Sequence, residues 1–141
     1  MKVREFSMED YSGVKRVWDE SGLETLLGDS KGEVKSKLER DPDLFLVAEE
    51  GGSIVGTVMG GWDGRRGWVY HLGVLPRFQR RGVATALIKE LETRLKAKGA
   101  IKVNAVVYGT NARSLEFFRR AGFKADTRSV LHGKVLRPER P

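Results

Sequence analysis

The twenty residues from Trp68 to Leu87 read WVYHLGVLPRFQRRGVATAL and decide the fold class that we predict. Trp68–Leu75 is apolar and aromatic and predicts a strand, which Pro76 ends because proline cannot donate a ladder hydrogen bond. A helix is predicted from about Gly82 to Lys98, and its apolar residues recur at helical spacing: Ala84, Leu87, Ile88, Leu91 and Leu95. A strand that passes into an amphipathic helix indicates a layered domain of mixed helices and strands.

The start of this helix has the features of an anion-binding site. The first turn of a helix leaves about four backbone N–H groups without partners, and the helix dipole adds positive potential there. Gly82 allows a ligand to approach the backbone closely, Ala84 keeps the next position small, and Arg80 and Arg81 add mobile charge. These features predict a cradle for a pyrophosphate. Neither the G-x-G-x-x-G fingerprint nor a G-x-x-x-x-G-K-[ST] phosphate loop occurs in the sequence.

The rest of the chain alternates between strand and helix signals on both sides of this segment. Before it we predict strands over Lys2–Phe6, Leu44–Glu49 and Ile54–Met59, with two helices that begin at Ser7 and Ser30 and end near Gly22 and Asp41. After it we predict a strand over Ile101–Val107, a helix over Asn111–Ala121, and closing strands over Phe123–Ala125 and Val130–Val135. The expected order is β-α-α-β-β-β-α-β-α-β, which is an α/β (α+β) arrangement.

Length and composition exclude several classes of protein. The 141 residues fit a single domain over 1–141. The chain has no cysteine, and its two histidines, His71 and His132, are far apart in sequence, so we expect no disulfide, no thiolate chemistry and no metal. No apolar run approaches the roughly 18–20 residues of a membrane span. Met1–Phe6 has no signal-peptide character, and we therefore expect a cytoplasmic protein without a membrane partner.

Positive charge is concentrated around the opening segment. The formal net charge is +7, and no acidic residue lies between Asp63 and Glu90, whereas six basic residues do: Arg65, Arg66, Arg77, Arg80, Arg81 and Lys89. Such a field attracts an anion, which could be nucleic acid, an acidic partner or a phosphorylated small molecule. Few aromatic residues interleave these arginines, which argues against a surface that stacks nucleic-acid bases.

Two motifs resemble the signatures of the GNAT superfamily of N-acetyltransferases. Gln79-Arg80-Arg81-Gly82-Val83-Ala84 matches the acetyl-CoA motif [QR]-x-x-G-x-[GA], and Asn111–Phe123 (NARSLEFFRRAGF) is similar to the second signature, N-x-x-[AS]-x-x-[FLM]-[YF]-x-x-x-G-F. Both occur in the family's order, and the predicted elements agree with the family over essentially the whole chain. The resemblance implies the small single-domain GNAT-like fold, with a mostly antiparallel sheet and a V-shaped splay between the fourth and fifth strands.

The resemblance also implies acetyl-CoA as co-substrate and a set of residues that would bind it. Leu72 and Val74 would pair with the pantetheine arm like an added strand, and a bulge at Gly73 would open the gap between strands. Asn111 would reach the pantetheine, and Phe118 lies at the position that faces the thiolate. The pyrophosphate would lie on the backbone of Gln79, Arg80, Arg81, Gly82, Val83, Ala84 and Thr85.

The catalytic residues are where this sequence departs from the family. The family's usual proton donor to the thiolate is a tyrosine at the position of Phe118, so Tyr108 and Tyr70 are the substitutes that we consider. The strand that carries a carboxylate in many relatives has none here. His71 is the expected general base in its place, since an ordinary imidazole pKa of about 6.5 suits that role. A structural histidine, a water activated by Asp63 or Glu24, and an amine that arrives already neutral are the alternatives.

The acceptor is left open between the amine of a small molecule and a peptide or protein N-terminus. We expect its selection by Glu20–Arg40 and Arg128–Pro141, where the acidic residues Glu20, Glu24, Asp29 and Glu33 could attract a cationic amine or could be an ordinary polar helix face. A non-catalytic acyl-CoA sensor and, less favoured, a nucleic-acid-binding domain are the alternative functions. A homodimer is a possible assembly.

Overall fold

The computed structural model describes residues 1–23 and 26–141 and contains a five-stranded sheet with the order β1-β2-β3-β4-β5. The strands are β1 (Lys2–Glu5), β2 (Phe45–Glu50), β3 (Ser53–Trp62), β4 (Gly67–Val74) and β5 (Val103–Ala105). Neighbours pair antiparallel up to β4, and β5 pairs parallel to β4. The predicted mixed fold with a mostly antiparallel sheet is confirmed.

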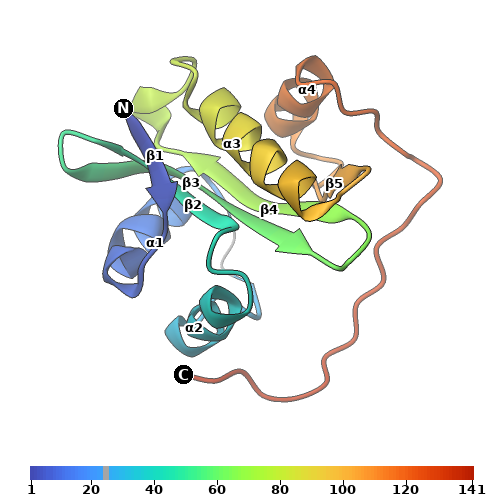
Figure 1. Ribbon diagram of the computed structural model, residues 1–141, viewed down its shortest axis with the longest axis horizontal. Coiled ribbons are helices and arrows are strands. Elements are labelled where there is room, and N and C mark those ends of the chain that lie inside the picture. The colour runs from blue at the N-terminus through green and yellow to red at the C-terminus, as the bar shows by residue number, and fades with distance from the viewer. Residues whose placement is uncertain (24–25) are drawn as a thin grey trace.

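The described residues form four α-helices, and Figure 1 shows α1 and α2 on one face of the sheet and α3 and α4 on the other. They are α1 (Tyr11–Glu20), α2 (Lys31–Arg40), α3 (Val83–Lys98) and α4 (Ala112–Arg120), and the short 3-10 turns η1 (Met8–Asp10) and η2 (Pro76–Phe78) precede α1 and α3. Their ends follow from the sequence. The side chains of Ser30 and Asn111 accept hydrogen bonds from the first turns of α2 and α4, and α3 lies between Gly82 and Gly99, both left-handed.

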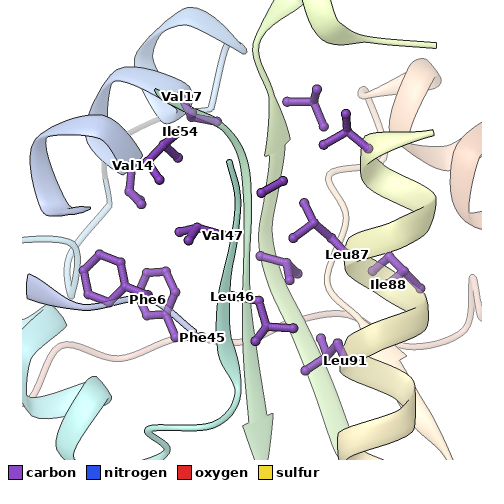
Figure 2. Close-up of a cluster of buried hydrophobic side chains, with 14 of the residues drawn as sticks. Phe6, Val14, Val17, Phe45, Leu46, Val47, Ile54, Leu87, Ile88 and Leu91 are labelled. Carbon is purple, nitrogen blue, oxygen red and sulfur yellow. The ribbon is translucent and has the colours of Figure 1, made fainter. Parts of the chain in front are cut away.

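The core lies on both sides of the sheet. Figure 2 shows Val14 and Val17 of α1 close to Ile54, and Phe6 against Phe45, whose rings stack at 4.2 Å between centroids. On the opposite face, α3 contributes Val83, Leu87, Ile88, Leu91 and Leu95, all of them buried. The long helix after the cradle is therefore anchored along its whole length.

The end of the chain differs from the prediction. The element order is confirmed as far as α4, but the expected closing strands Phe123–Ala125 and Val130–Val135 are not formed, since no strand follows α4 in the described residues. The segment instead runs around the molecule toward α2 (Figure 1). β5 has only three residues and offers little edge for a further strand, whereas the charged residues after position 136 find partners at α2.

No helix in the described part of the chain is long and apolar enough to cross a membrane. Within the same residues, no group of three or more His, Cys, Asp or Glu side chains could hold a metal ion.

Candidate active site

A β-bulge interrupts β4 at its centre. Thr57 pairs with Gly73 and Met59 with Tyr70, so the single residue Val58 on β3 lies opposite both His71 and Leu72. His71 has a positive φ of 48°, which is uncommon for a residue other than glycine. The sequence-based prediction placed this bulge at Gly73 and was wrong by one to two residues.

Gly73 is required for a different reason. A Cβ atom at this position would lie 2.9 Å from the Ser21 Oγ, 3.1 Å from the Leu23 Cδ1 and 3.3 Å from the Val17 Cγ1. The glycine therefore allows α1 and the loop that follows it to pack directly against β4.

The bulge changes the side toward which the backbone of β4 points. Before it, the Val69 carbonyl accepts the Val106 N–H at 3.3 Å and so faces the β5 side, whereas after it the Leu75 N–H donates to the Val55 carbonyl on β3 at 2.9 Å. In a regular strand residues 69 and 75 would face the same neighbour, because backbone groups alternate with a period of two. The extra residue therefore turns the backbone groups of Leu72 and Val74 away from β3.

Pairing between β4 and β5 ends before the bulge. The last paired residues are Val69 and Ala105, whereas β4 continues to Val74. Leu72 and Val74 thus direct their backbone groups to the side on which β4 has lost its neighbour. This is the arrangement expected of a splayed pair of strands.

The predicted cradle follows at the end of β4. Gly82 is left-handed with φ 82°, and a Cβ there would meet no atom within 4 Å, so the backbone at the start of α3 is open. Arg80 is also left-handed, with φ 62°. Arg77 and Arg81 each lie 5.3 Å from the ring centroid of Phe78, and these cation–π contacts hold two guanidinium groups beside the cradle. Val83 is buried, Ala84 is half-buried and Thr85 is exposed.

Gln79 connects the cradle to the splayed strand. Its side-chain N–H donates to the Val74 carbonyl at 3.1 Å, and its Oε1 accepts from the guanidinium of Arg113 on α4 at 2.5 Å. Gln79 thus satisfies one of the backbone groups that the bulge turns outward, and it links β4 to α4.

His71 lies against α1 and the loop between α1 and α2. Its Nε2 is 2.9 Å from both carboxylate oxygens of Asp29, and its ring is 5.2 Å from that of Trp18. The side chains of His71 and Asp29 are only 15% and 5% exposed. The sequence analysis did not predict Asp29 as the partner of His71. It considered Asp29 only as a charge that could attract the acceptor, and 42 positions separate Asp29 from His71.

Asp63 is poorly suited to the alternative role of base. Its carboxylate accepts hydrogen bonds from the backbone N–H groups of Arg66 and Arg65 and from the Trp68 indole. These bonds lower the pKa of Asp63 to about 2, with the Arg66 N–H as the largest cause. Glu24, the other carboxylate considered, lies outside the described residues.

The two tyrosines considered as proton donors lie in different surroundings. Tyr70 stacks on Trp68 at 6.3 Å between ring centroids, and burial, followed by the charge of Asp63, raises the pKa of its phenol. Tyr108 follows β5 and is 55% exposed. Phe118 is buried on α4, edge-on to the rings of Phe117 and Phe123.

Three carboxylates of the first expected acceptor segment have partners in this chain, and one of them, Glu33, joins that segment to the second. Glu33 binds Arg137 and Arg140, Asp29 binds His71, and Glu20 lies 3.8 Å from Arg16. The structure therefore brings the two segments together, and it leaves these three carboxylates already engaged.

The basic stretch is not one surface. Arg65 and Arg66 precede β4, whereas Arg77, Arg80 and Arg81 follow it, so the eight-residue strand separates the two groups by roughly 26 Å if it is fully extended. Only the second group lies at the cradle.

A five-stranded sheet whose bulged fourth strand leads into an open helix N-terminus defines a mixed α/β fold suited to an anionic ligand, and comparison with known proteins specifies the family. Residues 2–123 match the model of the Acetyltransferase (GNAT) family. An acetyltransferase of Sodalis glossinidius is 40% identical over 136 residues, which cover 96% of each chain. The chain therefore belongs to the GNAT family, and it is an acetyltransferase.

Solved structures show the same fold. Ard1 from Thermoplasma volcanium superposes with a TM-score of 0.81 at 24% identity, over 89% of this chain and 84% of that one. PaiA N-acetyltransferase from Thermoplasma acidophilum, solved in complex with coenzyme A, gives a TM-score of 0.79 at 21% identity, over 89% and 90% of the two chains.

Proposed function

We propose that this acetyltransferase moves the acetyl group of acetyl-CoA to a primary amine, either of a small molecule or of a peptide or protein N-terminus. The observation that carries the proposal is the bulge at His71, which turns the backbone of Leu72 and Val74 outward directly before the cradle at Gly82. An extended pantetheine arm can pair with such outward-facing backbone groups as an added strand does, although the Val74 carbonyl already accepts from Gln79. The coenzyme A bound to PaiA, a protein of the same fold, supports the same cofactor here.

The residues of the cradle fit a pyrophosphate. The first turn of α3 presents backbone N–H groups and the positive end of the helix dipole, and Gly82 has no side chain to block the approach. Gln79, Arg80 and Arg81 lead into this turn, and Val83, Ala84 and Thr85 form it. Asn111, which caps α4, is proposed to reach the pantetheine, and Phe118 to line the same region.

Acetyl-CoA supplies a thioester carbonyl that the amine attacks. A C–N bond forms, the C–S bond breaks, and the proton lost by the amine must be taken up while the thiolate gains one. We assign the first transfer to His71 and the second to Tyr108, with Tyr70 as the alternative donor. Backbone N–H groups between Leu72 and Val74 would stabilise the oxyanion.

The acceptor is proposed to carry a single reactive amine rather than a row of positive charges. Glu20, Asp29 and Glu33 could attract a polyamine only if they were free, and each already has a partner in this chain. The relatives named acetyltransferases favour an enzyme over a sensor that only binds acyl-CoA.

Two glycines on the same helix allow a matched test of the cofactor site. Gly82 and Gly99 flank α3, both have positive φ, and neither would bring a Cβ within 4 Å of another atom. We expect saturating CoA, at about 100 times Kd, to raise the melting temperature of the wild type and of Gly99→Leu by about 5–10 °C. Gly82→Leu should lose this shift, because its side chain would occupy the cradle. An equal shift in both variants would place the cofactor elsewhere.

The acceptor is then found by activity. Release of the CoA thiol from acetyl-CoA is followed with a panel of small amines and short peptides with free N-termini. Turnover with at least one of them is expected; binding of acetyl-CoA without turnover on any would favour the sensor.

A further inference from the structure

The contact between His71 and Asp29 determines which ring nitrogen can act as a base. A carboxylate only accepts hydrogen bonds, so the Nε2 that lies 2.9 Å from both oxygens of Asp29 carries the hydrogen. The lone pair is then on Nδ1. Asp29 therefore selects a tautomer and fixes the orientation of the ring, in addition to its charge.

Asp29 is itself held by its loop and by α1. Its Oδ2 accepts the Leu26 N–H at 2.8 Å, and its own N–H donates to the Leu26 carbonyl at 3.1 Å. The hydroxyl of Tyr11 on α1 donates to the Asp29 carbonyl at 2.8 Å. These bonds fix Asp29 to Leu26 within its own loop and to Tyr11 on α1.

The far end of the sequence holds both neighbours of Asp29. The Oε1 of Glu139 accepts the backbone N–H groups of Gly28 and Ser30, each at 2.9 Å. These are the residues immediately before and after Asp29, 111 and 109 positions away from Glu139. Figure 1 shows how the segment after α4 crosses to this side of the molecule and ends beside α2.

The residues around Glu139 secure it in this place. Arg137 and Arg140 donate to the carboxylate of Glu33 on α2 at 2.7 Å and 2.9 Å, and the Gly32 N–H donates to the Pro141 carbonyl at 2.9 Å. Ser30 Oγ also donates to the Arg140 carbonyl. Residues 137–141, which we call the strap, are thus anchored at α2 while Glu139 reaches the loop.

We propose that Glu139 is a positioning residue of the acetyltransferase: it fixes the backbone on both sides of Asp29, and Asp29 in turn fixes the tautomer and orientation of His71. The strap is then a part of the active site, although 65 residues of the sequence lie between His71 and Arg137. The inference rests on the proposed role of His71 as base.

The first test reads the imidazole directly and needs no substrate. The chain has only two histidines, so a His132→Gln background leaves His71 alone in a ¹⁵N imidazole spectrum. The groups that face the imidazole are Asp29 from the loop and the Trp18 ring from α1. Tyr11 contacts Asp29, and Glu139 contacts the backbone beside Asp29. We expect the neutral ring to show one tautomer, with hydrogen on Nε2. Glu139→Ala should give a mixture of tautomers, and Glu139→Gln, which keeps an acceptor oxygen, should restore much of the single form.

The second test is the rate of acetyl transfer with its pH dependence. We expect Glu139→Ala to lower kcat about tenfold and Asp29→Ala about 10²-fold, with the affinity for CoA unchanged in both. Asp126→Ala is the matched control. It removes a carboxylate from the same segment after α4, but one whose partners among the described residues are its neighbours Arg128 and Ser129. This variant should keep both the wild-type kcat and the tautomer.

Two outcomes overturn the inference and can be told apart. If Glu139→Ala keeps the wild-type spectrum and kcat while loss of His71 lowers kcat, the strap is only a structural attachment and the proposed base stands. If loss of His71 leaves kcat unchanged, the base assignment fails and the positioning role fails with it.

Discussion

His71 combines three features that rarely occur together on one residue. It lies in a bulge, it has a left-handed backbone with φ 48°, and its ring is held by a buried carboxylate. A residue other than glycine in this backbone region costs of order 1 kcal/mol, and such strain gathers where the structure serves a function. These features together make His71 the residue on which the proposed chemistry depends.

His71→Asn tests this role with little change in the backbone, because asparagine tolerates the left-handed region better than other non-glycine residues. We expect kcat to fall about 10²-fold or more, as is typical when a general base is lost. The rise of the wild-type rate with pH that a general base produces should disappear in the variant. The affinity for CoA must stay the same. An unchanged pH profile would indicate that the acceptor arrives as the neutral amine.

The histidine could be predicted from sequence, whereas its partner could not. His71 is predicted from the resemblance to a family in which many relatives carry a carboxylate on this strand, since the strand here has none and His71 is the titratable residue next to Leu72. Asp29 lies in a loop without periodicity, and contacts between distant parts of the chain, such as the packing of α1 against Gly73, bring that loop to β4. The predicted position of the bulge was wrong for a similar reason. Glycine is the usual sequence signal for irregular backbone, but Gly73 provides space for α1 instead.

At the scale of elements, α3 packs closely against the sheet at three glycines. A Cβ at Gly56 would lie 2.8 Å from Val83, one at Gly60 2.4 Å from Leu91, and one at Gly67 2.6 Å from Leu95. The side chains on successive turns of α3 thus approach the sheet where it has no side chains. This close approach sets the position of the helix, and with it the position of the cradle at its N-terminus.

Gly60→Ala should therefore destabilise the protein, whereas Gly61→Ala should not. At position 60 the new methyl group would also lie 2.9 Å from the Leu44 carbonyl, and backbone cannot move aside as a side chain can. At position 61 the nearest atoms lie at 3.5 Å or more, which is ordinary contact. We expect a loss of about 1–3 kcal/mol in the free energy of unfolding for Gly60→Ala and a change within about 0.5 kcal/mol for Gly61→Ala. Equal denaturant midpoints for the two variants would contradict this view of the interface.

Elements with strong local signals were predictable, and those that depend on distant partners were not. The capped and periodic helices α1 to α4 lie where the sequence indicates. The second expected closing strand, Val130–Val135, is not formed, and its apolar residues Val130, Leu131 and Val135 are all exposed. A strand needs a long free edge beside it, and the length of β5 cannot be read from the residues that would pair with it.

At the scale of the whole molecule, Glu33 links α2 to the strap at the far end of the sequence. It lies on α2, and its partners Arg137 and Arg140 belong to the strap. The side chain of Arg137, followed by the backbone N–H of Arg140, lowers the pKa of Glu33 from 4.5 to about 2. The layered core does not need this contact, since it is complete before residue 124.

The low pKa of Glu33 predicts how this attachment responds to acid. A carboxyl group whose pKa is depressed in the folded state contributes stability that is full above its unfolded pKa and is lost as the pH falls through the folded value. The difference in melting temperature between the wild type and Glu33→Gln should therefore be constant above about pH 5 and shrink from about pH 4.5 to pH 2. A difference that does not vary with pH over this range would show that the charge of Glu33 does not hold the strap.

The bulge in β4 also has a consequence for how sequences on this scaffold diverge. Its effect depends on the number of residues between Tyr70 and Gly73 rather than on their chemistry, so no point substitution can reproduce or abolish it cleanly. A single-residue deletion there would remove the bulge, and Leu72 would then follow Val69 at the regular spacing of two and still face the β5 side. The expected loss is the local bend and extra twist that a bulge gives its strand, so a change of chain length at this place should alter the course of β4 toward the cradle more than a change of side chain would.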